Sequence, residues 1–556
     1  MAEKKVLVLG AGAAGIQAAL SEAAAGNKVY VAEHFPSFGG ERIPQDKIIT
    51  DGDAFTAPDL ATFKSNDNIE FLRNADVQAL VGDNGQYKAK IHCRTPRVDP
   101  EKCDECGKCI TVCPIHMYDD YNEGLEWRTA VDFFDSGSGY YNIYKEDMPV
   151  CQRTCPINLP IRTYVGYIAD GKYAESLAAI RERLPFPLSI GRICPHPCEA
   201  ECNRQYKDEP ISICFLKRFV ADYELNNNIE PKIFQPEESF SEKIAILGAG
   251  PSGLTCAYHL ARFGYQNIVV YEALPQPGGM FRVGIPEYRL PWEILSKDIE
   301  FITKHGVEIK CGVRIGQDIS FDDIKKDHDA VLIAIGAHKG MSARVKNEDA
   351  EGVFEGIHLL RNMALGKDFP ITKGKAIVIG GGNVAMDVTR TCLRAGFDEV
   401  NLLYRRTRKE LPASPWEVDA AEHEGVKFHF LVAPQEVVVK DGKAVGMKCQ
   451  RMELGEPDAS GRRKPVPVEG SEFVMDADAI FGAIGQVTDN TIVDEKYGFT
   501  FGRKLNFEVN PETFETNVEG VFASGDAATG ANIAIRACAG GMKAAESIHK
   551  YLRGKK

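Results

Sequence analysis

The sequence predicts an α/β protein built from nucleotide-binding units, because one glycine pattern recurs three times. Each copy follows a short apolar run typical of a buried strand (VLVLG, IAILG and AIVIG) and opens an Ala- and Leu-rich helical pattern. Such glycines permit a tight turn and let a pyrophosphate approach the helix N-terminus. The copies are Gly10, Gly12 and Gly15; Gly248, Gly250 and Gly253; and Gly380, Gly382 and Ala385.

Length and charge restrict the class of protein. The 556 residues predict about three to four domains. A net charge of -13 argues against a nucleic-acid or anionic-membrane partner, and no apolar run approaches the ~20 residues of a membrane span. The basic and apolar start imitates a secretory signal, but the glycine spacing and the acid Glu33 fit a nucleotide-binding unit better. We therefore expect a cytoplasmic enzyme.

Four cysteines have the spacing of a bacterial ferredoxin. Cys103, Cys106, Cys109 and Cys113, followed by Pro114, form the run CxxCxxCxxxCP that binds a 4Fe-4S cluster. Zinc sites instead pair two CxxC knuckles across a longer gap. Because the run occurs once, we expect all four thiolates on one cluster.

A second group of six cysteines fits no standard zinc finger. Its members are Cys151, Cys155, Cys194, Cys198, Cys202 and Cys214. Six thiolates supply one full cluster with two left over, or two clusters completed by other ligands. The six scattered cysteines are expected to be inert packing residues: Cys93, Cys256, Cys311, Cys392, Cys449 and Cys538.

The second glycine copy has the supporting motifs of an FAD site. Glu272 lies 19 residues after Gly253, the spacing at which an acid binds an adenosine ribose. Gly278 and Gly279 and the segment GIPEYRLP (284–291) follow. GVFASGDAATG (520–530) looks like the second flavin-contacting motif of flavoproteins with two dinucleotide-binding domains. That likeness implies that Asp526, after Gly525, contacts the ribityl-phosphate region. A helix from about Ile533 would direct its positive end toward a reduced flavin.

The third copy has the features of an NADPH site. Gly380, Gly382, Asn383 and Ala385 open the unit, and its second strand ends in Arg405 and Arg406 where an NAD site has an acid. A guanidinium suits a 2'-phosphate, so NADPH is favoured over NADH; the alternative is a general basic edge with Arg408 and Lys409. Asp387 either caps the helix or contacts the cofactor. No catalytic acid or base is assigned, because hydride transfer to flavin needs mainly stacked rings.

Two similar segments flank the third copy. DAVLIAIGA (329–337) and ADAIFGAIGQ (477–486) suggest that the chain leaves one nucleotide domain for another and then returns. In the N-terminal unit we expect strands at 5–9 and 28–32 and a helix at 13–25. The expected domains are 1–95, an N-terminal Rossmann-like module; 96–120, a ferredoxin-like insert; 121–150, a linker; 151–240, a helical iron-sulfur domain; 241–340 and 480–556, the FAD domain; and 341–479, the NAD(P)H domain.

From Cys151 onward the chain resembles the family of the glutamate synthase small subunit, which includes a matching part of dihydropyrimidine dehydrogenase and the large subunit of NADH-dependent ferredoxin:NADP oxidoreductase. The resemblance rests on CxxxCP, GRICPHPCEAEC, GAGPSG, PGGMFRVGIPEYRLP, GGGNVAMD, YRR and ASGDA, in that order. It implies a helical iron-sulfur domain before FAD and NADPH domains, and electron transfer between NADPH and a partner subunit or domain.

Residues 1 to about 130 resemble instead the start of the heterodisulfide reductase flavin subunit. The matching pieces are GAGAAGIQAAL, Gly39 and Gly40, NIEFL, VDPEKCDECGKCITVCP and NEGL. Only one ASGDA-type segment exists for two candidate flavin domains, and DGDAFTAPDLA (51–61) lacks the cysteines that the resemblance implies. With Gly10, Gly12, Gly15 and Glu33, this module either binds a second FAD or is an empty docking scaffold.

The chain also departs from the glutamate synthase family. That family has a further CxxC before the CxxxCP run, whereas no cysteine lies between Cys113 and Cys151. One cluster of the family therefore loses two ligands. We expect the surviving cluster on Cys155, Cys194, Cys198 and Cys214; Cys151 and Cys202 are then free or belong to an irregular cluster. Two clusters per chain are favoured, and three are the alternative.

These motifs favour an NAD(P)H-linked oxidoreductase subunit that passes electrons between FAD, 4Fe-4S clusters and a partner enzyme or ferredoxin, within a hetero-oligomeric complex. The alternatives are the glutamate synthase small subunit itself and a redox-silent docking or assembly protein. A thioredoxin-reductase-like enzyme would need a CxxC in the nicotinamide domain, where Cys392 stands alone.

Overall fold

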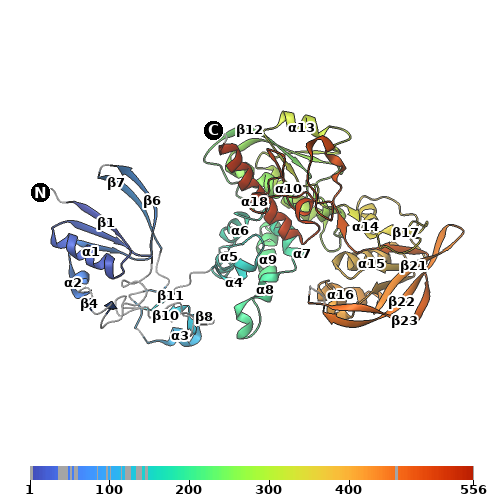
Figure 1. Ribbon diagram of the computed structural model, residues 1–556, viewed down its shortest axis with the longest axis horizontal. Helices are drawn as coiled ribbons and strands as arrows, with labels where there is room; N and C mark the ends of the chain where they lie inside the picture. The colour runs from blue at the N-terminus through green and yellow to red at the C-terminus, as the bar shows by residue number, and fades with distance from the viewer. Residues whose placement is uncertain are drawn as a thin grey trace. The chain divides into compact units, whose positions relative to one another are not determined.

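The computed structural model contains two compact units (Figure 1). One unit comprises Met1–Val150 with Cys202–Ile211, and the other comprises Cys151–Glu201 with Ser212–Lys556. The described residues are 4–34, 48–50, 53–55, 60–83, 85–94, 98–99, 102–104, 106–113, 116–118, 127–132, 141–143, 148–457 and 461–554. Among them, no helix has both the length and the apolar character needed to span a bilayer.

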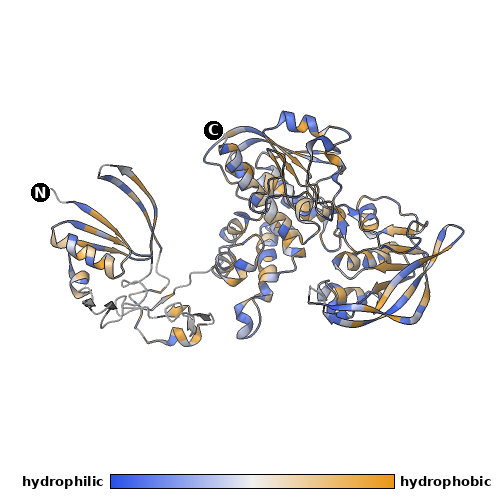
Figure 2. Cartoon of the chain, viewed as in Figure 1, coloured by the Kyte–Doolittle hydropathy of each residue, from blue (hydrophilic) through white to orange (hydrophobic). Residues whose placement is uncertain are grey.

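The N-terminal unit contains a parallel sheet of three strands in the order β1-β2-β5. Its strands are β1 (Lys5–Leu9), β2 (Lys28–Ala32) and β5 (Ile69–Leu72), and α1 (Ala13–Ala24) follows the glycine turn. Ile16 and Ala19 of α1 pack with Val29 and Val31 of β2, and these segments are largely hydrophobic (Figure 2). The predicted strands are confirmed, and the predicted helix ends one residue early.

The described rest of this unit contains antiparallel strand pairs and two short helices. The helices are α2 (Leu60–Ser65) and α3 (Lys108–Val112). The strand pairs are β3 (Ile48–Thr50) with β4 (Asp53–Phe55), β6 (Ala75–Asp83) with β7 (Gln86–Cys93), β8 (His116–Tyr118) with β9 (Trp127–Thr129), and β10 (Val131–Asp132) with β11 (Asn142–Ile143). The expected linker at 121–150 thus contains strands in its described parts.

Helices dominate residues 150–226, as the sequence predicts. They are α4 (Val150–Thr154), α5 (Ile161–Ala169), α6 (Tyr173–Arg181), α7 (Pro187–Ile193), α8 (Pro197–Ala200), the 3-10 turn η2 (Asn203–Tyr206) and α9 (Ile213–Asn226). Proline opens α7 and α8, where its missing N–H has no helical partner to lose. The buried face of α9 carries Ile213, Cys214, Lys217, Val220 and Ala221, the spacing of a helix packed on one side.

The first large sheet is parallel and has the order β14-β13-β12-β15-β26. Its strands are β12 (Phe240–Leu247), β13 (Tyr265–Glu272), β14 (Glu308–Cys311), β15 (Ala330–Ile333) and β26 (Val521–Ala523). On it, α10 (Pro251–Phe263) packs closely against α18 (Ala534–Gly554) (Figure 1). A Cβ on Gly541 of α18 would lie 2.1 Å from the Ser252 carbonyl oxygen, so this crossing requires glycine.

The second large sheet is also parallel, in the order β17-β24-β18-β19-β20. Its strands are β17 (Val353–Glu355), β18 (Lys375–Ile379), β19 (Glu399–Tyr404), β20 (Lys427–Phe430) and β24 (Ala479–Gly482). The accompanying helices are α14 (Gly356–Ala364), α15 (Asn383–Ala395) and α16 (Pro415–His423). An antiparallel sheet of β21 (Val432–Lys440), β22 (Lys443–Pro457) and β23 (Arg463–Asp476) follows β20.

The chain crosses between the two large sheets twice. The similar segments at 329–337 and 477–486 contain β15 in the first sheet and β24 in the second, which confirms the predicted exit and return. Short strands in the two crossings, β16 (Lys339–Gly340) and β25 (Gln486–Val487), pair with each other. β24 spans the expected boundary at 479–480, and the chain returns to the first sheet only after Gly482.

Candidate functional site

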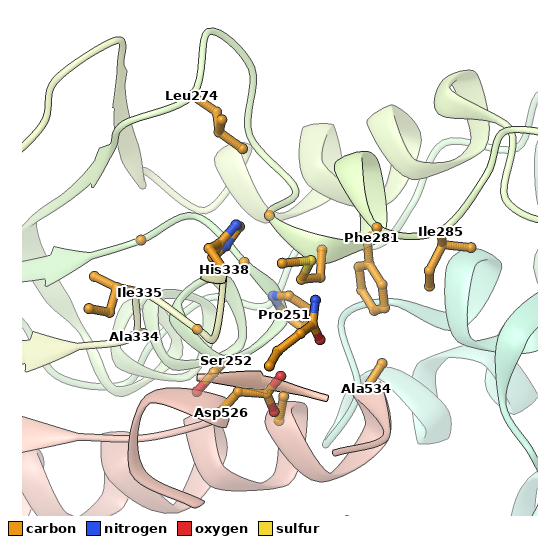
Figure 3. Close-up of a pocket in the computed structure, with 18 of the residues that line it drawn as sticks. Pro251, Ser252, Leu274, Phe281, Ile285, Ala334, Ile335, His338, Asp526 and Ala534 are labelled. Atoms are coloured by element: carbon orange, nitrogen blue, oxygen red, sulfur yellow. The ribbon is translucent and has the colours of Figure 1, made fainter. Parts of the chain in front are cut away.

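A cavity of about 470 Å³ opens beyond the carboxyl ends of the first large sheet, the usual ligand position in open α/β sheets (Figure 3). Residues from three parts of the chain line it. Among them are Gly248, Gly250, Glu272, Gly279, Asp526 and Ile533 of the predicted flavin motifs, Asn383 and Asp387 of the third glycine copy, and Cys194 and Pro195 of the helical domain. The structure thus brings predicted flavin, nicotinamide and cluster residues to one cavity.

Glu272 stands at the predicted adenosine end of this cavity. Its carboxylate accepts hydrogen bonds from the amides of Ala249 and Leu274, both at 2.8 Å. Burial raises the pKa of Glu272, although these two amides oppose the shift. Nearby, Gly279 has a positive φ of 52°, and a Cβ there would lie 2.8 Å from the Gly250 Cα. Gly279 therefore lets the loop pass close to the N-terminus of α10.

Asp526 stands at the other end of the flavin motifs. It begins the short helix α17 (Asp526–Thr529), and its side chain points into the cavity (Figure 3). Burial raises its pKa to about 6. The long helix α18 begins at Ala534, one residue after the predicted start, and Ile533, Ala534 and Ile535 line the cavity. The positive end of α18 therefore lies at the cavity wall.

Asp387 does not cap its helix. Gly382 occupies the cap position of α15, and no side chain caps it. Both Asp387 carboxylate oxygens instead accept from Arg289 Nη1, at 2.8 and 2.7 Å. Burial raises the pKa of Asp387 to about 6, and the Arg289 charge opposes that shift. Asp387 also lines the cavity, so the predicted alternative of a cofactor contact remains.

Arg289 extends this contact into an ion-pair network. Its Nε lies 2.9 Å from Glu417 Oε1 on α16, and Glu417 Oε2 lies 2.7 Å from Arg390 Nη1 on α15. The Arg394 guanidinium stacks over the Tyr288 ring, 3.9 Å from its centroid. The network therefore ties the 284–291 loop to the helices of the second large sheet. Removing one partner of such a buried pair typically costs about 3–5 kcal/mol.

The two arginines after β19 lie in different environments. Arg405 is exposed. Arg406 is buried, and its Nε donates to the Arg463 carbonyl oxygen at 2.8 Å. Arg408, part of the alternative basic edge, is paired with Asp419 and Glu422. Arg405 is thus the accessible guanidinium of the predicted pair. The other residues of the third glycine copy lie at the start of α15. Gly380 precedes the helix, Gly382 is its N-cap, and Asn383 and Ala385 lie in its first turn. Asn383 Oδ1 accepts a hydrogen bond from the Ser414 amide at 2.8 Å.

A second, small cavity lies inside the helical domain. Four cysteines line it, and they are the four that the sequence assigns to the surviving cluster: Cys155, Cys194, Cys198 and Cys214. The Cys214 thiol and the buried lysine nearby lower the pKa of Cys194, whereas burial raises the pKa of Cys155 and that of Cys198. Among the described residues, no group of three or more Cys, His, Asp or Glu side chains forms a metal-ion site as placed. Four cysteine thiolates are nevertheless the usual ligand set of a 4Fe-4S cluster, so the chemistry of this lining fits that group.

Lys217 also lines this small cavity, although the sequence motifs did not predict it as a site residue. Its side chain is 4 % exposed. Burial acts to lower the pKa of Lys217, but the four surrounding cysteines outweigh burial and raise it. A buried ammonium among thiols needs anionic partners, and a thiolate-bound cluster supplies them. The available signal was the spacing Cys214-x-x-Lys217, which puts both on one helix face.

The ferredoxin-type cysteines lie in the N-terminal unit. Cys106 is exposed, and Cys103, Cys109 and Cys113 are half-buried. The Tyr141 amide donates to Cys103 Sγ at 3.4 Å. Pro114 lies outside the described residues. Cys151 lies on α4, and Cys202 is buried just before η2. The two cysteines belong to different compact units.

The first glycine copy repeats one contact of the second. Glu33 is buried and accepts from the Ala11 amide, just as Glu272 accepts from Ala249. In the described residues, however, β1 has only β2 beside it, whereas β12 is flanked by β13 and β15. Gly39 and Gly40 lie outside the described residues. The module that opens with Gly10, Gly12 and Gly15 therefore shares the acid–amide contact of the second copy.

Among known families, three models match the chain. The pyridine nucleotide-disulphide oxidoreductase model covers residues 242–545, a dihydropyrimidine dehydrogenase domain II 4Fe-4S model covers 145–229, and a 4Fe-4S binding domain model covers 95–119. These ranges contain the two large sheets, the small cysteine cavity and the ferredoxin-type run.

Curated relatives also match much of the chain. The NADP(+)-dependent formate dehydrogenase subunit beta of Moorella thermoacetica is 45% identical over 72% of this chain and 60% of its own length. The NADPH-Fe(3+) oxidoreductase subunit beta of Geobacter sulfurreducens is 43% identical over 72% and 63%. The glutamate synthase [NADPH] small chain of Escherichia coli is 32% identical over 82% of this chain and 97% of its own length. The chain thus spans about 60% of the first two relatives.

A solved structure matches the fold. FprA of Mycobacterium tuberculosis in complex with NADPH aligns with a TM-score of 0.50 at 18% identity, over 57% of this chain and 85% of that one. At this identity the match supports the arrangement of two dinucleotide-binding domains and nothing finer.

Proposed function

The chain belongs to the pyridine nucleotide-disulphide oxidoreductase family, and from that premise we propose that it passes electrons between NADPH, FAD, 4Fe-4S clusters and a partner redox protein. One observation carries the proposal: Cys194 and Ile535 line both the large cavity and the small cysteine cavity. A flavin in the first and a cluster in the second would share a wall. Flavin, when bound, accepts a hydride and releases its electrons singly.

Each flavin motif has a distinct role in this proposal. Glu272 binds the adenosine ribose, and the N-terminus of α10 binds the pyrophosphate. Asp526 binds the ribityl-phosphate region, and the first turn of α18 directs its positive end toward the flavin pyrimidine edge. The cavity position of these residues supports the assignment.

For the nicotinamide cofactor, the N-terminus of α15 binds the pyrophosphate and Arg405 binds the 2'-phosphate. The exposure of Arg405 supports this choice over Arg406, whose Nε is engaged by the Arg463 carbonyl. Asn383 and Asp387 line the flavin cavity from the nicotinamide side, so the two rings meet there. Holding the rings in register is the main demand of hydride transfer.

We propose two clusters per chain. One is held by Cys155, Cys194, Cys198 and Cys214, and the other by the ferredoxin-type run in the N-terminal unit. Iron and sulfide analysis of anaerobically purified protein should give about eight irons per chain. About twelve irons would mean a third, irregular cluster that includes Cys151 or Cys202. Flavin content separates the two predictions for the first module, with two FAD per chain if it is filled and one if it is a scaffold.

The partner is proposed to be a redox subunit or a ferredoxin within a cytoplasmic hetero-oligomeric complex. The two relatives named above as beta subunits support this. The role of a glutamate synthase small subunit is disfavoured by the N-terminal unit and the missing CxxC. Failure of purified protein to reduce an artificial dye with NADPH would favour a redox-silent assembly protein.

A Cys194→Ser variant tests the shared wall. We expect NADPH to reduce the flavin at a rate close to that of the wild type, while the cluster signal in electron paramagnetic resonance is lost or no longer develops. Cys93→Ser, at an exposed cysteine outside both groups, is the matched control and should behave as wild type. Undiminished cluster reduction in Cys194→Ser would overturn the assignment.

A further inference from the structure

Lys217 is the one cation among the residues that line the small cysteine cavity, apart from His196, whose charge depends on pH. It lies on the buried face of α9, three residues after Cys214, and is 4 % exposed. Within the described residues, no hydrogen-bond acceptor or carboxylate pairs with its ammonium group. Its charge therefore faces the thiols of Cys155, Cys194, Cys198 and Cys214.

An acid beside these cysteines, Glu199, is already engaged. Glu199 on α8 accepts from the Cys214 amide at 2.7 Å through Oε1, and its Oε2 lies 3.2 Å from His196 Nδ1. Burying an ammonium group without a counter-charge costs several kcal/mol. An anionic occupant of the cavity would compensate the charge of Lys217.

A thiolate-bound cluster is such an occupant, and its charge changes during the reaction. With four thiolates it is anionic when oxidised, and one electron from the flavin makes it more negative. No ligand bond forms or breaks in this step, and the ammonium keeps its protons. A fixed positive charge in a low-dielectric interior stabilises the more negative state more strongly, which raises the reduction potential.

We propose that Lys217 is a positioning charge that raises the reduction potential of the cluster on Cys155, Cys194, Cys198 and Cys214, and so allows it to accept electrons from the flavin. This inference rests on the proposed function, since it assumes a cluster in that cavity. It assigns to Lys217 a role in the redox balance between the two cavities and no contact with a substrate.

The test is a redox titration of anaerobic holoprotein with mediators, monitored by electron paramagnetic resonance. In Lys217→Met and Lys217→Gln, the equilibrium constant for reduction of this cluster should fall at least about tenfold, which is a midpoint about 59 mV lower for one electron. Lys217→Arg should keep the wild-type midpoint. Arg218→Met is the matched control: it removes the same charge from α9 at a side chain that pairs with Asp222 and does not line the cavity.

Each outcome decides the proposal. An unchanged midpoint in both neutral variants, or an equal shift in Arg218→Met, would overturn it. Loss of the cluster from the neutral variants but not from Lys217→Arg supports a need for positive charge. Loss from all three Lys217 variants contradicts a charge role and points to the shape of lysine. The ferredoxin-type cluster in the same sample is an internal reference whose midpoint should not move.

Failure of the proposed electron-transfer function would give a different result from failure of the role of Lys217. Mediators and dithionite set the potential, so the midpoint does not depend on NADPH. If NADPH fails to reduce the flavin of the wild type, the proposed function fails whatever the Lys217 variants show. If NADPH reduces the flavin normally in all variants while the midpoints coincide, only the role of Lys217 fails.

Discussion

Arg289 Nη1 binds both carboxylate oxygens of Asp387, at 2.8 and 2.7 Å, and thereby joins the flavin-side loop to the first turns of α15. Both residues line the large cavity, and both are largely buried. The contact therefore fixes the approach of this loop to α15 at the cavity in which, under the proposed function, the flavin and nicotinamide rings stack.

Replacing Asp387 with Asn should disturb that approach. The amide loses the charge that Arg289 binds, and removing one partner of a buried pair costs about 3–5 kcal/mol. We expect flavin reduction by NADPH, followed by anaerobic stopped-flow absorbance, to slow at least about tenfold through loss of ring register. Asp419→Asn, at an exposed partner of Arg408, is the control and should leave the rate unchanged. A wild-type rate in Asp387→Asn would refute the positioning role.

Removing Arg405 should change cofactor selectivity. A charge-assisted hydrogen bond contributes about 1.5–3 kcal/mol, so Arg405→Ala should lower kcat/KM for NADPH by about 10- to 100-fold and leave kcat/KM for NADH nearly unchanged. Arg408→Ala, whose guanidinium is paired with Asp419 and Glu422, should not change the ratio. If kcat/KM falls equally for NADPH and NADH, Arg405 acts on the fold and not on the 2'-phosphate.

Gly541→Ala should weaken flavin retention. The added Cβ would meet the Ser252 carbonyl at 2.1 Å and push α18 away from α10. Overpacking of this kind costs about 1–3 kcal/mol. We expect a lower thermal midpoint and loss of FAD during gel filtration. Gly554→Ala is the matched control, because nothing lies within 4 Å of its added Cβ. Equal behaviour of the two variants would contradict the close crossing.

Asp298 should make stability depend on pH. It lies on α12 (Trp292–Thr303) and accepts from the Ser189 amide at 2.8 Å, near the start of the helix that leads to Cys194. Burial raises the pKa of Asp298 to about 7. A folded-state pKa above the unfolded value of ~3.9 gives stability that is present below pH ~4 and lost as pH rises through about 7.

The thermal midpoint of the wild type should therefore fall between pH 5 and pH 8 more steeply than that of Asp298→Asn, which cannot titrate. Asp441→Asn, at an exposed turn, should keep the slope of the wild type. If the thermal midpoint of the wild type and that of Asp298→Asn depend on pH with the same slope, this titration is ruled out.

Much of the fold could be predicted from local pattern, because the strand-turn-helix units are specified within about thirty residues. The spacing from Gly253 to Glu272 follows from such a unit. The set Cys155, Cys194, Cys198 and Cys214 follows instead from cysteine spacing and the family resemblance. The pairing of β16 with β25 and the Arg289 network could not be predicted, because they join segments 98 to 150 residues apart, as with Arg289–Asp387 and Lys339–Asp489. Lys217 was missed because a lysine in an otherwise apolar stripe reads as a surface residue.

The proposed electron path is best examined by reducing the anaerobic wild-type protein with NADPH, freeze-quenching it and following both flavin absorbance and electron paramagnetic resonance. We expect the flavin to bleach first and the signal of the Cys194-ligated cluster to rise afterwards, and neither change to occur when NADPH is omitted. A reduced flavin beside a cluster that stays oxidised, although dithionite reduces it, would contradict the proposed electron path.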